Sequence, residues 1–207
     1  MPFYRKFKSE DSIIALWRIE EDLSFFESKF DLHPPIQNES KKLQWFATRH
    51  LLNEMIGTYA EVLKYDTGKP YLKDTVHHIS ISHTTAFAAV MVNPNKSVGV
   101  DLEMVNPKVE RIAHKFLRED EISAIHPDEK IEKLILYWSA KEALYKMFGK
   151  NQVEFKTHLL IEPFELKLKG TLHAKILTND VHIENLEVPY EFFDGHVISY
   201  VCSSITQ

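Results

Sequence analysis

Apolar residues recur at helical spacing in three stretches of the chain. These stretches cover residues 11–30, 40–55 and 129–148. Apolar positions three and four residues apart place one side of a helix against a core. Gly57 and Gly149 follow the second and third stretches, and glycine commonly ends a helix. We therefore predict three long helices at these places.

Elsewhere the pattern changes to short runs that favour strands. Residues 79–81 and the alternating stretch 97–105 predict two strands, with a short apolar run at 87–92 between them. After residue 153, short β-rich runs dominate and predict antiparallel strands. Those runs are residues 166–168, 172–177 and 196–205. Residues 107–117 and 119–125 have helical spacing and lie between the two sets of strands.

Each part of the chain thus has its own helices and its own small sheet. We predict an α+β fold made of two similar halves, residues 1–105 and 106–207, each with a small antiparallel sheet and helices. The segment Val105-Asn106-Pro107 is the best candidate for the boundary between them.

Composition narrows the class of protein. The chain has 207 residues, a hydrophobic share of 44% and a net charge of −5, so nothing global attracts nucleic acid or an anionic membrane. No apolar run is long enough to span a membrane, and the first residues lack the pattern of a signal peptide. Cys202 is the only cysteine, which excludes an intrachain disulfide and suits the reducing cytoplasm. We expect a cytoplasmic protein that binds neither nucleic acid nor membrane.

Two carboxylates lie one pleat repeat apart on the strand predicted at 97–105. Side chains alternate along a strand, so Asp101 and Glu103 share one face, opposite Val100. Two such carboxylates repel each other unless a proton or a cation relieves them, and Mg²⁺ prefers oxygen ligands of this kind. By themselves they are more typical of a solvent-facing strand. Gly99 favours the metal site, because glycine inside a strand often marks a close approach by another element.

The third predicted helix carries a carboxylate on its apolar side. On a helical projection, Lys141 and Glu142 fall inside the apolar arc, and Lys146 lies at its edge, one turn beyond Glu142. A buried lone carboxylate is costly and needs a partner. The alternative is a surface ion pair between Glu142 and Lys146. A metal shared with Asp101 and Glu103 would supply that partner and leave positions for water and phosphate.

Four further residues are candidates for binding phosphate. Ser82 and His83 end the strand predicted at 79–81, where a hydroxyl and an imidazole are suitable donors. Lys69 lies in a turn, and Arg49 lies on the second predicted helix. Each of these four, taken alone, is more typical of an ordinary surface or structural residue.

Five segments together resemble one family in their order and spacing. They are Gly68-Lys69-Pro70, Ile81-Ser82-His83-Thr84, Val98-Gly99-Val100-Asp101-Leu102-Glu103, Lys115-Phe116-Leu117 followed by Glu121, and Trp138-Ser139-Ala140-Lys141-Glu142-Ala143-Leu144-Tyr145-Lys146. The chain resembles the phosphopantetheinyl transferases, of the larger monomeric type that activates peptide synthetases and acyl carrier proteins. The last two segments are specific, whereas the first two would be weak alone. Thr84 departs mildly from the second serine of many members and keeps a hydroxyl.

The resemblance implies a metal centre and a set of catalytic residues. Mg²⁺, with Mn²⁺ as an alternative, would be held by Asp101, Glu103 and Glu142 against the pyrophosphate of coenzyme A. The catalytic residues would be Asp101, Glu142 and Lys146. Lys141, next to Glu142 in the same segment, is a further candidate for binding coenzyme A.

The resemblance also implies where coenzyme A binds. It would lie between two halves related by a pseudo-twofold axis, with the active site between them. Ser82, His83 and Lys146 would contact its phosphates, and Arg49 and Lys69 would hold its nucleotide end. We expect a monomer that docks an acidic carrier protein near residues 115–118.

The implied reaction is attack by a carrier serine on the β-phosphorus of coenzyme A. The 4'-phosphopantetheine arm is transferred and 3',5'-ADP leaves, which makes the protein a holo-carrier-protein synthase. Glu142 is a candidate general base, directly or through a water molecule. Two alternatives remain: a metal-dependent phosphodiester hydrolase with the same carboxylates, and a non-catalytic module that binds coenzyme A or a carrier protein.

Overall fold

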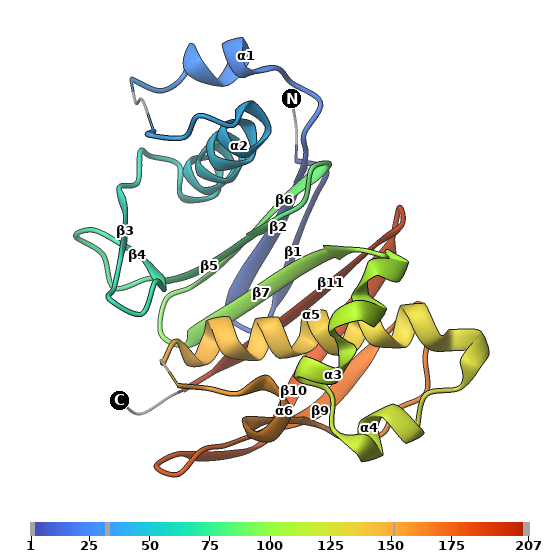
Figure 1. Cartoon of the computed structure of the whole chain (residues 1–207). Helices are drawn as coiled ribbons and strands as arrows, with labels where there is room; N and C mark the ends of the chain where they lie inside the picture. The colour runs from blue at the N-terminus through green and yellow to red at the C-terminus, as the bar shows by residue number, and fades with distance from the viewer. Residues whose placement is uncertain (1–2, 32–33, 151, 205–207) are drawn as a thin grey trace.

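The protein is built of four layers, in the order helix, sheet, sheet, helix (Figure 1). The computed structural model describes residues 3–31, 34–150 and 152–204. Helix α2 (Glu39–Ile56) covers the first sheet, the two sheets face each other, and helix α5 (Lys130–Phe148) covers the second sheet. Every strand pairing that the structure describes is antiparallel. The predicted α+β class is confirmed.

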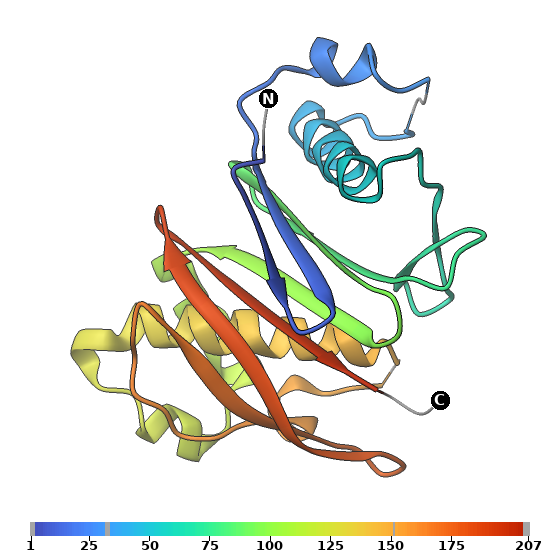
Figure 2. The same ribbon diagram turned by 180° about the vertical axis from the view of Figure 1, so that it is seen from behind.

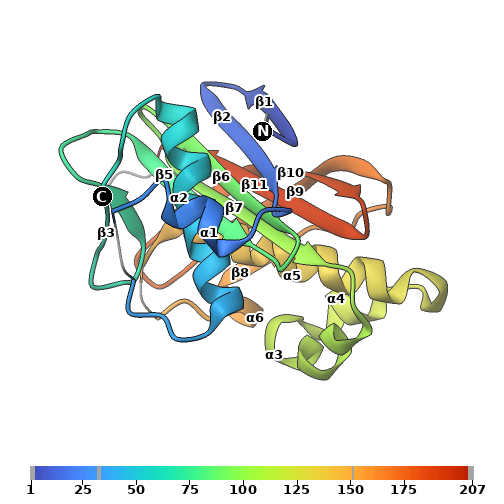
Figure 3. The ribbon, with the colours of Figure 1, turned by 90° about the horizontal axis from the view of Figure 1, so that it is seen from above.

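The first sheet has the strand order β1-β2-β6-β5. Its strands are β1 (Arg5–Ser9), β2 (Ser12–Arg18), β5 (His78–His83) and β6 (Phe87–Asn93). Helix α2 and the short helix α1 (Leu23–Glu27) lie over one face of this sheet (Figure 3). The hairpin of β3 (Val62–Lys64) and β4 (Pro70–Leu72) forms a separate small sheet beside β5.

The second sheet has the strand order β7-β11-β10-β9-β8. Its strands are β7 (Ser97–Met104), β8 (Leu159–Ile161), β9 (Lys169–Leu177), β10 (His182–Phe193) and β11 (His196–Ser203). Helix α5 packs chiefly on β7 and β11. In Figure 2, which shows the molecule from behind, these strands lie in front of α5.

Short helical segments connect β7 to the rest of the second sheet. They are η1 (Pro107–Ile112), α3 (Ala113–Phe116), α4 (Glu119–Ser123), η2 (Pro127–Glu129) and α6 (Phe155–His158). They agree with the helical spacing at 107–117 and 119–125. Among the residues that the structure describes, no helix is long and apolar enough to cross a membrane.

An apolar core joins the two sheets. Ile14, Leu16 and Phe87 of the first sheet pack against Val98 and Val100 of the second. Burial of aliphatic and aromatic side chains stabilises by about 1.5–3 kcal/mol for each fully buried one, so this core holds the two sheets together firmly. An ion pair between Arg5 of β1 and Glu191 of β10, at 2.6 Å, adds a polar link across the same boundary.

Strand β7 connects the two predicted halves. It falls within residues 1–105, yet it is hydrogen-bonded to β11, with Asp101 opposite Ser199. It also contacts β5 of the first sheet, where Ser80 Oγ accepts a hydrogen bond from the Val100 amide at 3.0 Å. The division at residue 105 stays a prediction, and the strand before it belongs to the second sheet.

The helices predicted at 40–55 and 129–148 are confirmed as α2 and α5. Each ends at a glycine with left-handed backbone: Gly57 has φ 80° and Gly149 has φ 64°. Other residues adopt this conformation only with strain, so the glycines end the helices for the reason predicted.

The prediction of one helix at 11–30 is wrong. Residues 12–18 form β2, and only Leu23–Glu27 is helical. Ile14 and Leu16 face the second sheet, whereas Ala15 and Trp17 face α2. A strand that is buried on both faces shows no alternation of apolar and polar residues, so its apolar run also fits a helical pattern.

The strand pattern near the C-terminus is partly confirmed. Strands β9 and β11 lie at the stretches 172–177 and 196–205, although residue 205 is outside the described residues. Residues 166–168 are not a strand, and Leu168 is 80% exposed. The sequence pattern missed β10, the longest strand described, because only one of its faces packs on α5, and because it contains Pro189 and several charged residues.

Candidate active site

The predicted carboxylate strand lies directly against helix α5. A Cβ atom built on Gly99 would lie 1.9 Å from the carbonyl oxygen of Ala143. The glycine therefore marks a close approach, as expected. Asp101 and Glu103 share the face of β7 that carries Gly99, so both carboxylates project toward α5.

Gly99→Ala is expected to destabilise the protein by about 3 kcal/mol, because the new methyl group overlaps the backbone of α5. Chemical denaturation measures this change. Gly170→Ala is the matched control: its Cβ would meet only the Tyr190 side chain, at 3.0 Å, and a side chain can move. Equal effects of the two substitutions would contradict the close packing of α5 on β7.

Asp101 is the most constrained of the carboxylates. It is 2% exposed. Its Oδ1 atom accepts hydrogen bonds from Lys146 Nζ at 2.7 Å and from Ser82 Oγ at 3.1 Å. Its Oδ2 atom is buried and has no hydrogen-bond partner among the described residues. One oxygen is therefore held by the protein, and the other is left for another partner.

Ser82 of the first sheet and Lys146 of helix α5 both bind Asp101 of the second sheet. Lys146 Nζ also donates to Ser82 Oγ at 3.1 Å and to the Val100 carbonyl at 3.2 Å. Ser82 Oγ accepts from the Leu102 amide of β7 at 3.1 Å. The structure thus places three predicted residues, from β5, β7 and α5, in one hydrogen-bonded cluster.

Glu103 and Glu142 complete a group of three acidic side chains. Burial, followed by the nearby charge of Asp101, raises the pKa of each to about 7. Glu103 Oε1 also accepts a hydrogen bond from Trp138 Nε1 of α5 at 2.9 Å. Lys146 is the cation paired with Asp101, at 2.7 Å. One buried and two half-buried carboxylates beside one lysine favour binding of protons or of a cation.

The donor set suits a hard divalent cation, although the ligands are not gathered tightly. Within residues 3–31, 34–150 and 152–204, no three His, Cys, Asp or Glu side chains converge as a ready-made metal site. However, Asp101 Oδ2 is a buried carboxylate oxygen without a partner among the described residues, and the pKa values of Glu103 and Glu142 are raised by burial and then by the charge of Asp101. Oxygen ligands of this kind fit Mg²⁺ chemically.

A cavity of about 540 Å³ adjoins this cluster. Its lining includes Arg49 of α2, Lys69 of the turn before β4, and His83 and Lys146, together with Lys41, Lys64 and Trp45. No acidic residue occurs among the described residues that line it. A cavity of this size with several cations and no carboxylate favours an anionic ligand.

Two cations of the cavity are strongly desolvated. Burial lowers the pKa of Arg49 to about 10 and the pKa of Lys69 to about 8. The Arg49 guanidinium lies 4.6 Å from the centre of the Trp45 ring. Lys69 Nζ donates to Ser97 Oγ and to the Met147 carbonyl, both at 2.6 Å. Neither cation has a described carboxylate partner within salt-bridge distance, so a bound anion would relieve the burial of both.

His83 lies at the rim of the same cavity. Its pKa is lowered by loss of hydration and then by the positive charges of Lys146 and Arg49. The following residue, Thr84, holds this segment in place: its Oγ1 contacts His196 Nε2 at 3.2 Å and accepts from the Phe87 amide. The second hydroxyl of the segment therefore has a structural contact.

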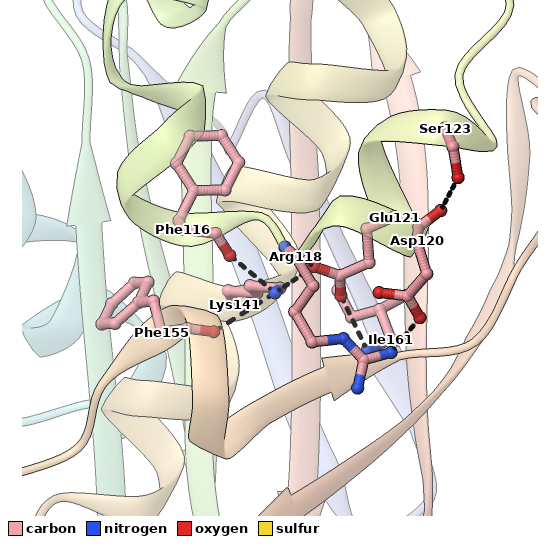
Figure 4. Close-up of polar contacts among 8 residues, drawn as sticks. All are labelled: Phe116, Arg118, Asp120, Glu121, Ser123, Lys141, Phe155 and Ile161. Atoms are coloured by element: carbon pink, nitrogen blue, oxygen red, sulfur yellow. Dashed lines mark hydrogen bonds and ion pairs between the residues drawn. The ribbon is translucent and has the colours of Figure 1, made fainter.

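Lys141 is separate from this cluster. It is fully buried, and its Nζ donates to Glu121 Oε2 at 2.8 Å and to the carbonyls of Phe116 and Phe155 at 2.7 and 3.2 Å (Figure 4). These three bonds use all three protons of the ammonium group. Lys141 does not line the cavity, so the geometry favours a structural role over the predicted contact with coenzyme A.

The sequence pattern missed part of the cavity. Lys41, Trp45 and Lys64 line it, yet none lies in a recognisable motif. From the sequence alone, Lys41 and Lys64 are typical of solvated surface lysines, and Trp45 is typical of a core residue of α2. Only the packing of α2 beside the β3–β4 hairpin brings them to one place.

Comparison with known proteins defines the class. The family model of the 4'-phosphopantetheinyl transferase superfamily matches residues 97–201, about half of the chain. The chain therefore belongs to this superfamily, and the predicted family is confirmed. It is an enzyme of the 4'-phosphopantetheinyl transferase class, while its assignment to the larger monomeric type stays a prediction.

Individual relatives point the same way. The 4'-phosphopantetheinyl transferase HetI of a Nostoc species is 32% identical over 64% of this chain and 60% of its own length. The 4'-phosphopantetheinyl transferase AcpT of Escherichia coli O157:H7 is 23% identical over 72% of this chain and 74% of its own length. A 4'-phosphopantetheinyl transferase of Bacillus subtilis is 32% identical over 56% of this chain and 50% of its own length.

Proposed function

We propose that this enzyme transfers the 4'-phosphopantetheine arm of coenzyme A to a serine of an apo carrier protein, with Mg²⁺ bound by Asp101, Glu103 and Glu142. The main support for the proposal is that Lys146 belongs to both the cationic cavity and the carboxylate cluster. It lines the cationic cavity and also donates to Asp101 in the carboxylate cluster. An anion-binding cavity and a cation-binding cluster thus meet at one side chain.

The cavity suits the phosphorylated nucleotide end of coenzyme A. Arg49 and Lys69 are desolvated cations that a phosphate would neutralise. Trp45 offers an aromatic face, and apolar residues such as Ile79 and Ile81 line the same wall. His83 and Lys146 lie toward the carboxylate cluster, where the pyrophosphate would be placed.

The carboxylate cluster suits the reacting pyrophosphate. A divalent cation, Mg²⁺ or Mn²⁺, would supply charge neutralisation of the pyrophosphate oxygens. Asp101, Glu103 and Glu142 would bind it, and Lys146 and Ser82 orient Asp101 through Oδ1. Lys146 would add positive charge, and the neutral imidazole of His83 could donate a hydrogen bond, where the leaving group develops negative charge.

The chemical step is attack by the carrier serine oxygen on the β-phosphorus. A new phosphorus–oxygen bond forms to the serine, and the bond to 3',5'-ADP breaks. The serine proton must go to a base. Glu142 is the candidate and acts through a water molecule, because a carboxylate that binds a cation is itself a poor base. Because the nucleophile belongs to the carrier, positioning and charge neutralisation are the main contributions of this chain.

The docking site for the carrier is proposed on the segment 115–118. It contains Lys115 of α3 and Arg118, the residue before α4, and α3 contacts α5. Carrier proteins are acidic, whereas this chain has a net charge of −5, so docking requires a local basic surface.

A mass-shift assay tests the function. The enzyme is incubated with coenzyme A, Mg²⁺ and several apo carrier proteins, and each carrier is weighed by mass spectrometry. A gain of one phosphopantetheine supports the transferase. Free phosphopantetheine with an unmodified carrier would instead indicate a phosphodiester hydrolase. Coenzyme A binding without any turnover on any carrier would indicate a binding module.

Lys69 is expected to make nucleotide binding depend on pH. Its pKa of about 8 means that the ammonium form is present below pH 8 and is lost as the pH rises through 8. Affinity for 3',5'-ADP in metal-free buffer should therefore fall about tenfold between pH 7 and pH 9. Nearby His78 has a lowered pKa and stays neutral over this range. Calorimetric titration measures the effect.

Two variants of Lys69 sharpen this prediction. Lys69→Ala should weaken coenzyme A binding more than it slows the chemical step, and its residual affinity should vary little with pH. Lys69→Arg keeps the charge at every pH tested and should remove the decline above pH 8. An unchanged KM for coenzyme A in Lys69→Ala would count against the assigned role.

A further inference from the structure

Three buried polar atoms without partners lie at the contact between α5 and the second sheet. They are Asp101 Oδ2 and the hydroxyl oxygens of Ser139 and Ser199. Both serines are fully buried. A buried polar atom that forms no hydrogen bond is costly, so each of these atoms calls for an explanation.

The strand register places Ser199 beside Asp101. Ser199 of β11 lies directly opposite Asp101 of β7 in the antiparallel pairing. Side chains of such a pair share one face of the sheet, with Cβ atoms about 5 Å apart. Val197 and Val201, two residues away on either side, belong to the core under α5, so Ser199 also faces α5.

Ser139 approaches the same region from the helix. It lies one turn before Ala143, the residue whose carbonyl oxygen contacts the Gly99 position of β7. The neighbouring Trp138 donates to Glu103, which places this turn of α5 over the carboxylate end of β7. Ser199 of β11 is therefore the hydroxyl that the strand register places beside Asp101, while Ser139 lies on the turn of α5 that packs near β7.

We propose that Ser199 is a positioning residue for Asp101, with its hydroxyl donating to Oδ2 while Lys146 and Ser82 hold Oδ1. A rotation about one side-chain bond brings a serine hydroxyl to a carboxylate oxygen at this spacing. Both oxygens of Asp101 are then fixed, and Oδ2 keeps a second lone pair for a cation. The catalytic consequence rests on the proposed function, whereas the hydrogen bond itself does not.

A double-mutant cycle in metal-free buffer tests the hydrogen bond. Ser199→Ala, Asp101→Ala and the double variant are unfolded by denaturant. We expect Ser199→Ala to raise the unfolding equilibrium constant about tenfold more in the wild-type background than in Asp101→Ala. Ser203→Ala is the matched control, on the same face of β11 but four residues away, and its effect should be equal in both backgrounds. Additivity of Ser199→Ala and Asp101→Ala would overturn the proposal.

A second measurement tests positioning as opposed to mere packing. Mn²⁺ binding to the free enzyme, followed by electron paramagnetic resonance, should be about tenfold weaker in Ser199→Ala. The KM for coenzyme A should change less than twofold, while kcat falls. Ser199→Thr keeps the hydroxyl and should restore Mn²⁺ affinity. Wild-type Mn²⁺ affinity in Ser199→Ala would overturn the positioning role.

The two tests separate this inference from the proposed metal site. If the wild-type enzyme binds no Mn²⁺ and Asp101→Ala keeps its transfer rate, the metal assignment of the proposed function fails. The double-mutant cycle is measured without metal or substrate, so its result still decides whether Ser199 is bonded to Asp101.

Discussion

Replacing Asp101 by alanine is expected to lower the rate of phosphopantetheine transfer by about a thousandfold or more, equivalent to about 4 kcal/mol of transition-state stabilisation. The substitution removes the acceptor of Lys146 and Ser82 and the unpaired oxygen Oδ2 together. Both the proposed cation and Lys146 would then lose their fixed positions. Initial rates of carrier modification at several Mg²⁺ concentrations measure the effect.

Two controls separate charge from shape in this prediction. Asp101→Asn keeps the size of the side chain and one acceptor oxygen but removes the charge, so it should fold well and still be strongly impaired. Glu187→Ala removes an exposed carboxylate of β10 and should leave the rate unchanged. A near-wild-type rate for Asp101→Ala at saturating Mg²⁺ would refute the metal assignment, and the same holds for Glu142→Ala.

Replacing Lys141 by alanine is expected to destabilise the protein by about 4 kcal/mol. The reason is that Glu121 would be left as a buried, unpaired carboxylate, and the carbonyls of Phe116 and Phe155 would lose their donor (Figure 4). This ammonium group ties α3, α4 and the start of α6 to helix α5. Denaturant unfolding of the purified variant measures the loss.

The matched comparison uses both partners of the ion pair. Glu121→Gln keeps an acceptor for the Ile161 amide, and the double variant Lys141→Met/Glu121→Gln should be less destabilised than the sum of the single changes. A small stability change in Lys141→Ala, together with a raised KM for coenzyme A, would favour the role that the sequence motif implied for Lys141.

Helix α5 shows which features of the site a helical projection can predict. The projection placed Lys141 and Glu142 in the same apolar arc and so predicted that both are buried. It could not distinguish their partners. Lys141 faces α3, α4 and α6 and is fully bonded, whereas Glu142 lies near Asp101. Partners from distant segments are decided by tertiary packing, which a projection of one helix does not contain.

The two strands β2 and β7 show when a local sequence pattern predicts a strand and its faces, and when it does not. The alternation at 97–105 predicted that Asp101 and Glu103 share one face of β7, opposite Val98 and Val100. It did not predict that this face lies against α5. Strand β2 has apolar residues on both faces, since it lies between α2 and the second sheet. Its local pattern therefore carried no information that separates strand from helix.

The sequence by itself determined the class of this protein and which chemical groups lie together on β7 and on α5. Short motifs with regular spacing place Asp101 and Glu103 on one strand face and Glu142 and Lys146 on one helix, because strand and helix periods are local properties of the chain. Only the tertiary structure decided that Arg49 and Lys69 line one cavity with Lys146, that Lys141 has a structural partner, and that Ser199 lies opposite Asp101. These relations join segments far apart in the chain, and they depend on how the two sheets and helices α2 and α5 pack.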